Sequence, residues 1–258
     1  DLNLPGLQEG RTLLGRGSIE EAGHAYASWF RQRRFDSPLL IDWGDRSPDP
    51  GADTASADAL LGGDLFDGYA SCNAPDGIQW GLSPLGCATR FPMLAPLREA
   101  IFNTGDPRYI RWAVDHIMGY TRGYPIETFA GQRLKDGWVS HFDMADPWYW
   151  CMWGRLQQLS QTVNLVRRHT EMTDDELVQI LQRMYEEVSF VQFEMKEWVD
   201  TRHNGGLGLI CDMACALGIL DHFRQSKGWR ESVGAFTAQY IDEAFYPDGM
   251  CIELTTAY

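Results

Sequence analysis

The segment Gly205-Gly-Leu-Gly-Leu-Ile-Cys-Asp-Met-Ala-Cys-Ala-Leu-Gly-Ile-Leu220 is rich in small residues and predicts a helix that is apolar on nearly every face. A helix without a polar face has to be surrounded by other helices. An amphipathic helix is predicted next, from about Trp229 to Phe245. Buried and half-exposed helices therefore alternate here, as a toroid of antiparallel helical hairpins requires for its inner and outer rings.

Helix start signals recur upstream of this segment. Asp106 is a predicted N-cap before Pro107, and Asp146-Pro147 repeats the signal before a helix predicted from Trp148 to about Arg168. Thr173-Asp-Asp-Glu176 is a capping box that opens a helix to about Trp198. These signals predict an all-α body, although no sequence repeat accompanies them.

The first ninety residues are less regular. They predict one helix from Ser18 to about Arg33, a loop from Asp45 to Asp53 and a short helix at Ala57 to Leu61. With 258 residues and 44% hydrophobic content, the chain has enough material for a single large domain over residues 1–258. It contains no run of eighteen apolar residues, and its start lacks the features of a signal peptide, which leaves a removed leader open.

The formal charge of −14 argues against nucleic acid and anionic membranes as partners, because both require a basic surface. An anionic polysaccharide would need a local basic cleft, for which the candidates are Arg90, Arg133, Lys135, Arg155 and Arg202. Each of these fits an ordinary surface ion pair equally well.

Six cysteines without a Cys-x-x-Cys motif predict neither a disulfide framework nor a zinc site. Cys211 and Cys215 are spaced i,i+4 on the apolar helix, where we expect them to pack as small hydrophobic residues.

Two short segments interrupt the helices with polar residues next to glycine. Arg202-His-Asn-Gly-Gly206 lies between two predicted helices, where a helix N-terminus favours a bound anion. Asn204 and His203 can both hydrogen-bond to a carboxylate there, although Asn204 and Gly205 also suit a simple turn. The second segment, Tyr246 to Tyr258, begins with a Pro-Asp-Gly turn and ends on a phenol that can act as acid or base if nearby positive charge lowers its pKa.

Together these segments resemble the heparinase II/III-like lyases and the related alginate lyases. The resemblance rests on Asn204 at the start of the small-residue helix and on the pattern Pro-Asp-Gly-x-x-x-Glu-Leu-x-x-x-Tyr that ends at Tyr258. It extends upstream over most of the chain from about residue 57, through Pro75-Asp-Gly-Ile-Gln-Trp80, Thr104-Gly-Asp-Pro-Arg-Tyr109 and Trp148 to Arg155.

The resemblance implies an incomplete (α/α) toroid, normally followed by a β-sandwich domain that is absent here, so the chain is expected to be a fragment of a longer enzyme. It also implies β-elimination on a uronic-acid-containing polysaccharide. In this mechanism Asn204, with His203 beside it, neutralises the uronate carboxylate. Tyr258 acts at the departing 4-oxygen as general acid and, on some substrates, as the base at C5.

The same resemblance assigns the remaining site residues. Arg155, Arg90 and Arg202 would hold carboxylate or sulfate groups, and Glu253 would orient an Arg or His of the site. Sugar-stacking or groove-lining roles fall to Trp148, Trp150, Trp80, His141 and Gln79, although a core position accounts for each aromatic residue as well.

The predicted substrate is a glycosaminoglycan such as heparin or heparan sulfate, because several arginines are available for sulfates; alginate also satisfies the carboxylate chemistry. No cofactor is expected in this segment, and the resemblance allows a structural divalent cation in the following domain. It also suggests a periplasmic or secreted enzyme.

Two other functions fit the sequence. A toroid glycoside hydrolase acting on uronyl saccharides would need two carboxylates across a cleft, and Asp143, Asp146, Asp212 and Asp248 are available. A non-catalytic glycan-binding module would use the aromatic residues alone. The product separates these functions, since elimination creates an ultraviolet-absorbing double bond and hydrolysis does not.

Overall fold

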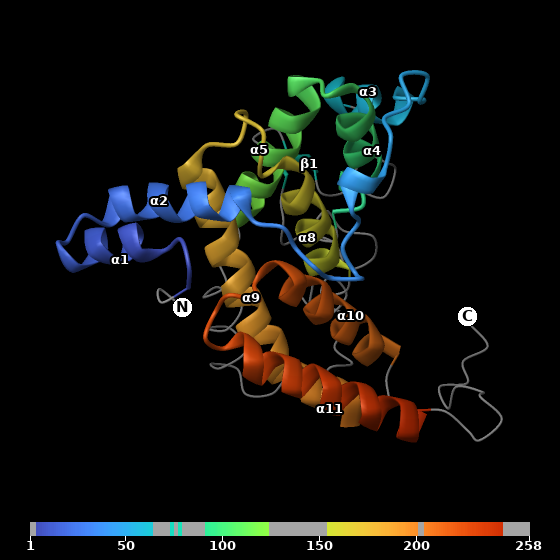
Figure 1. Ribbon diagram of the computed structural model, residues 1–258. Coiled ribbons are helices and arrows are strands. Elements are labelled where there is room, and N and C mark those ends of the chain that lie inside the picture. Colours follow the sequence, from blue (N-terminus) through green and yellow to red (C-terminus); the bar gives the residue numbers. More distant parts are fainter. Residues whose placement is uncertain are drawn as a thin grey trace, which may run out of the picture.

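The computed structural model describes residues 4–63, 73–74, 77–78, 91–123, 154–200 and 204–244, and these form a body of helices (Figure 1). The helices are α1 (Gln8–Gly15), α2 (Ile19–Gln32), the short 3-10 helix η1 (Trp43–Asp45), α3 (Ala55–Leu61), α4 (Leu94–Thr104), α5 (Pro107–Gly123), α8 (Arg155–Val166), α9 (Asp174–Asp200), α10 (Asn204–Ile219) and α11 (Ser226–Ala244). Two-residue strands β1 (Asn73–Ala74) and β2 (Gly77–Ile78) pair antiparallel. The predicted all-α class and incomplete toroid of helical hairpins are confirmed.

The hairpins α4–α5, α8–α9 and α10–α11 share one orientation. Hydrogen bonds from Arg111 to Glu176 and from Tyr120 to Glu187 show that α5 and α9 run in the same direction. Bonds between Gln192 and Ser232 and between Gln239 and Asp200 show the same for α9 and α11. The other helix of each hairpin runs the opposite way, so α4, α8 and α10 begin at the end of the body where α5, α9 and α11 finish. We call this end the Asn204 end.

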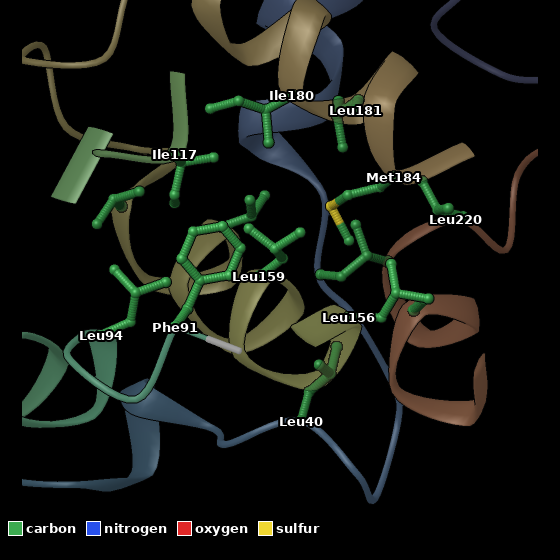
Figure 2. Close-up of a cluster of buried hydrophobic side chains, with 14 of the residues drawn as sticks. Leu40, Phe91, Leu94, Ile117, Leu156, Leu159, Ile180, Leu181, Met184 and Leu220 are labelled. Atoms are coloured by element: carbon green, nitrogen blue, oxygen red, sulfur yellow. The ribbon is translucent and has the colours of Figure 1, made fainter. Parts of the chain in front are cut away.

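The hydrophobic core lies between the two sets of helices. Figure 2 shows Leu94, Ile117, Leu156, Leu159 and Met184 meeting from α4, α5, α8 and α9, and all five are buried. Burying a side chain of this size stabilises a fold by roughly 1.5–3 kcal/mol. The core therefore fixes the relative placement of the hairpins.

The predicted helix starts at Asp106 and Thr173 are confirmed by their caps. The Asp106 carboxylate accepts the Arg108 backbone N–H at 2.8 Å. At Thr173, the Glu176 carboxylate accepts the Thr173 backbone N–H at 2.9 Å, and the Thr173 hydroxyl accepts the Glu176 backbone N–H at 3.2 Å. Both helix starts are thus determined by capping side chains that lie within three residues in sequence. The predicted helices at Ser18–Arg33, Ala57–Leu61 and Trp229–Phe245 are also present, with ends shifted by at most a few residues.

Two expectations are corrected. A single helix from Trp148 to Arg168 is wrong, because Gly154 has a left-handed backbone (φ +82°) and α8 begins after it; Trp148 itself lies outside the described residues. The α10 helix is not covered on every side either, since Leu207 is 44% exposed and Cys211 is exposed. Cys215 is buried, as expected.

Within the described ranges, no helix is both long and apolar enough to cross a membrane.

We expect Gly218→Ala to destabilise the fold by about 1–3 kcal/mol, the usual cost of overpacking a tight contact. A β-carbon at this position would lie 2.8 Å from the Ser37 hydroxyl oxygen and 2.9 Å from the Ser37 β-carbon, inside a loop packed on α10. Gly234→Ala on α11 is the matched control, because a β-carbon there meets nothing within 4 Å and alanine favours a helix. Urea unfolding of both variants checks this, and equal stabilities would contradict it.

Candidate functional site

Asn204 is the first residue of α10, as the sequence predicted, and buried Gly205 and Gly206 follow it. The first turn of a helix presents backbone N–H groups without intrahelical partners, and the helix dipole places partial positive charge there. This end of α10 is therefore suited to an anionic group. The Asn204 side chain itself lies outside the described residues.

The start of α8 is held by a residue from α10. Gly154 precedes α8 and offers no capping side chain, and the Asp212 carboxylate instead accepts the backbone N–H of Gln157 at 3.1 Å. Asp212 is 1% exposed and lies two helical turns after Asn204. This bond fixes the start of α8 against the helix that begins with Asn204.

A buried charged cluster, made of Tyr120, Arg155, Arg183 and Glu187, joins α5, α8 and α9. Glu187 accepts hydrogen bonds of 2.7 Å from each of Arg155, Arg183 and the Tyr120 hydroxyl. Arg183 also donates to the Tyr120 oxygen at 2.8 Å. We call these four residues the Glu187 cluster.

Electrostatics inside the Glu187 cluster favour the ionised carboxylate. Burial raises the pKa of Glu187, but the charges of Arg155 and Arg183 and the hydrogen bonds to the carboxylate outweigh this effect and hold the pKa below its usual range. Burial raises the pKa of the Tyr120 phenol to about 12, so this phenol stays protonated and donates. The cluster therefore carries two arginine charges against one carboxylate.

Arg155 is the one predicted substrate-binding residue whose side chain the structure describes. Its side chain is wholly buried and its Nε donates to Glu187. A direct contact with a polysaccharide requires exposure, so this geometry favours a structural role over the predicted substrate contact. Arg155 holds the start of α8 on α9.

The remaining predicted site residues lie outside the described residues: His203, Tyr258, Arg202, Arg90, Trp150, Trp148, His141, Gln79, Trp80 and Glu253, together with Arg133 and Lys135. In sequence, each belongs to a segment that precedes α4, links α5 to α8, links α9 to α10 or follows α11. All of these helix ends lie at the Asn204 end. Each of these segments is therefore joined, by at least one of its ends, to a helix end that faces the Asn204 end.

Sequence reasoning missed the Glu187 cluster and the role of Asp212 as a cap. Asp212 was considered only as a hydrolase carboxylate, whereas it is buried beneath the start of α8. Its possible partners Asp143, Asp146 and Asp248 lie outside the described residues. Within the part of the chain that the structure describes, no cluster of His, Cys, Asp or Glu residues could hold a metal ion.

Burial raises the pKa of Asp212 to about 7, although hydrogen bonds from the Gln157 and Gly154 backbone and the charge of Arg155 lower it. The negative charge of Glu187 adds to the increase, and among the described residues the Asp212 Oδ2 atom has no hydrogen-bond partner. The folded state therefore retains a proton on Asp212 at a pH where the unfolded chain, with a carboxyl pKa of about 4, has released it.

We expect the stability conferred by this protonated carboxyl to decrease as pH rises from 4 to 7, and to be lost above the folded pKa. Between pH 5 and 8 the loss is about 2–3 kcal/mol. Asp212→Asn removes the titration and leaves an acceptor for Gln157. Urea unfolding of both proteins at pH 5 and pH 8 checks this. The free energy of unfolding of the wild type, relative to that of the variant, should be larger at pH 5 than at pH 8. A difference between the two proteins that does not change with pH would exclude this titration.

The family model described as heparinase II/III N-terminus matches residues 1–258. No curated protein matches the chain. Among solved structures, the chain is similar to the heparinase III titled BT4657 gene product, with 18% identity, a TM-score of 0.69 and coverage of 98% of this chain and 40% of that one.

A mutant of the heparan sulfate lyase HepC from Pedobacter heparinus gives a TM-score of 0.65 at 18% identity, over 98% of this chain and 40% of that chain. A further heparinase III structure gives 0.69 at 17% identity, over 97% and 38%. At these identities the likeness establishes the fold. The chain spans about 40% of the length of these structures.

Proposed function

Because the chain belongs to the heparinase II/III N-terminus family, we propose that it is the single-domain toroid part of a lyase that cleaves uronic-acid-containing polysaccharides by β-elimination. Asn204 carries the proposal: it begins α10 at the end of the body to which every predicted site segment is attached. Heparan sulfate is the favoured substrate, because similar structures are titled heparinase III or heparan sulfate lyase. Alginate is the second candidate.

Asn204 acts on the substrate carboxylate. A proton next to a carboxylate is only weakly acidic, because its removal adds negative charge to a group that already carries one. The Asn204 carboxamide and the His203 imidazole donate to this carboxylate, and the N-terminus of α10 adds the positive end of its dipole. Together they stabilise the enolate as it forms.

Tyr258 completes the elimination. The C5–H bond breaks, its electron pair forms the C4–C5 double bond, and the C4–O bond breaks with the pair leaving on oxygen. Where Tyr258 serves as both base and acid, it starts as the phenolate, takes the C5 proton and passes that proton to the departing oxygen. On other substrates a separate base takes the C5 proton, and Tyr258 gives its own phenolic proton to the oxygen. Substrate contacts come from Arg90, Arg202, Gln79, His141 and Glu253 and from stacking on Trp80, Trp148 and Trp150, whereas Arg155 positions α8.

The partner in this proposal is an anionic uronate polysaccharide, with no role for nucleic acid, a membrane or a cofactor bound to this segment. The acidic chain meets this partner through local arginines rather than through its net charge of −14. Export to the periplasm or the medium fits a substrate of this size.

Ultraviolet absorbance tests the proposal on the full-length protein incubated with heparan sulfate, chondroitin sulfate, hyaluronan and alginate. We expect absorbance to rise on one polymer and the rise to vanish in Tyr258→Phe. Tyr185→Phe on α9 is the control and should retain turnover. New reducing ends without absorbance would indicate a hydrolase, and oligosaccharide binding with neither signal would indicate a binding module.

A further inference from the structure

A pocket lies at the other end of α8 from the Asn204 end. Its volume is about 580 Å³, and it lies between the loop of residues 34–45 and the last turn of α8. We call it the α8-end pocket. Because α8 has 12 residues and a helix rises 1.5 Å per residue, roughly 18 Å of helix separates this pocket from the start of α8.

The wall of the α8-end pocket is held in place by side chains of α8. Gln161 accepts the Ile41 backbone N–H at 2.9 Å and donates to the Leu39 carbonyl at 2.6 Å. Asn164, which lines the pocket, donates to the Ile41 carbonyl at 2.9 Å. The loop is thus fixed before any ligand arrives, which reduces the entropy cost of binding.

Two donors at the α8-end pocket have no acceptor. The Trp43 indole Nε1 and the Arg167 Nε are buried and, among the described residues, have no hydrogen-bond partner. Both residues line the pocket, and Arg167 is only 3% exposed. A buried donor left unpaired costs about 1–3 kcal/mol. Both atoms are shielded from solvent, so a ligand oxygen would recover that cost only where a side-chain shift lets it reach the donor.

Two further arginines at the α8-end pocket make only long, weak contacts with other protein groups. Arg34 is 86% exposed at its side chain and lies 3.7 Å from Asp42, and exposed Arg168 reaches the Arg31 and Arg33 carbonyls only at 3.3 and 3.4 Å. Such contacts add little stability in water. Both guanidinium groups are therefore available to pair with a carboxylate.

The other lining residues narrow the class of ligand. The lining also contains Asp36, Asp42 and Asp45, whose negative charges balance those of the three arginines. This balance disfavours a polysulfated chain. The carboxylates can nevertheless accept hydrogen bonds from hydroxyl groups. Phe35 and Trp43 also line the pocket. Arg167 lies over the Phe35 ring and Arg46 over the Trp43 ring, so only the remaining aromatic surface is open to a ligand. A ligand with many hydroxyls, one carboxylate and an apolar ring face matches this lining, and a pocket of this size accommodates a small molecule.

We propose that the α8-end pocket binds a single uronate unit, with Arg34 and Arg168 on its carboxylate, the aspartates on its hydroxyls and Trp43 along its ring. This inference goes beyond the proposed function, because the pocket is remote from Asn204. The site would retain a uronate polymer or its product without cleaving it.

Calorimetric titration of the full-length protein with sodium glucuronate tests the inference, with glucose and sodium acetate as comparison ligands. In an Asn204→Ala background, which disables the Asn204 end, glucuronate should still bind saturably. Arg34→Gln with Arg168→Gln should weaken this binding at least tenfold, and Trp43→Phe, which keeps the ring and removes the donor, about threefold. Arg16→Gln with Arg230→Gln makes the same charge change on exposed sites elsewhere and should have no effect.

Several outcomes would overturn the inference: no saturable binding, equal binding of glucose or acetate, or binding that survives the Arg34 and Arg168 changes. Loss of binding in Asn204→Ala alone would place glucuronate at the Asn204 end. Lyase turnover is measured separately and should persist in the Arg34→Gln, Arg168→Gln protein, so failure of this site and failure of the proposed function are distinguishable.

Discussion

Asn204→Ala should lower the kcat/KM of the full-length lyase by about 10²–10³-fold, the usual effect of removing one donor to a developing oxyanion. In the proposed mechanism the carboxamide neutralises the uronate carboxylate mainly as the C5 proton leaves, so the loss should fall on kcat more than on KM. Ultraviolet turnover assays on the best polymer substrate measure both constants.

Asn204→Ser separates this chemical role from a role in starting α10. Serine and asparagine have similar helix propensities, so serine should leave the first turn of α10 intact, but it lacks the amide donor. We expect the serine variant to keep the wild-type melting temperature and to lose as much turnover as the alanine variant. Asn204→Asp should lose more, because its charge repels the substrate carboxylate. Turnover within threefold of wild type in Asn204→Ser would remove Asn204 from the mechanism.

Helix starts in this chain could be predicted wherever the capping group is local. Asp106 and the Thr173–Glu176 pair cap helices within three residues of themselves, so the sequence shows them directly. The start of α8 could not be predicted in this way, because Gly154 turns the backbone without a side chain and the cap, Asp212, lies on α10. Caps that come from another helix leave no short-range pattern.

The candidate site and the pocket show the same limit, because contacts between residues far apart in sequence leave no local pattern. The position of Asn204 at the start of α10 could be predicted because the boundary between α9 and α10 is visible in the sequence as polar residues beside glycine. The Glu187 cluster could not, because Arg155 and Glu187 are 32 positions apart and only tertiary packing joins them. The α8-end pocket depends likewise on contacts of Gln161 and Asn164 with a loop about 120 residues away in sequence.

These long-range contacts connect the fold to the proposed chemistry. Asp212 and the Glu187 cluster hold α8 on α10 and α9, so the helix starts at the Asn204 end keep fixed relative positions. Groups that stabilise charge in a transition state act best when they need no rearrangement during the reaction. In the proposed mechanism, the buried polar contacts at the start of α8 would therefore serve catalysis by keeping the Asn204 end rigid.

Glu187→Ala should reduce the free energy of unfolding by about 3–5 kcal/mol, because it removes the carboxylate that pairs with the buried Arg155 and Arg183 charges. Urea unfolding measures the loss. Glu231→Ala on α11 is the control: its contact with Lys227 is 3.8 Å long and exposed, so its removal should cost less than about 0.5 kcal/mol.

A double-mutant cycle with Arg183→Ala should identify the cause. If the loss in Glu187→Ala comes from unpaired buried charge, removing one arginine as well should recover part of it, and the combined loss should be smaller than the sum of the two single losses. Additive losses would mean that lost packing accounts for the effect. Glu187→Leu together with Arg155→Met, Arg183→Met and Tyr120→Phe should fold with near wild-type stability, because apolar residues of similar volume can replace a buried charged cluster. Tyr120→Phe belongs to the set because the Tyr120 hydroxyl bonds to Glu187 and Arg183.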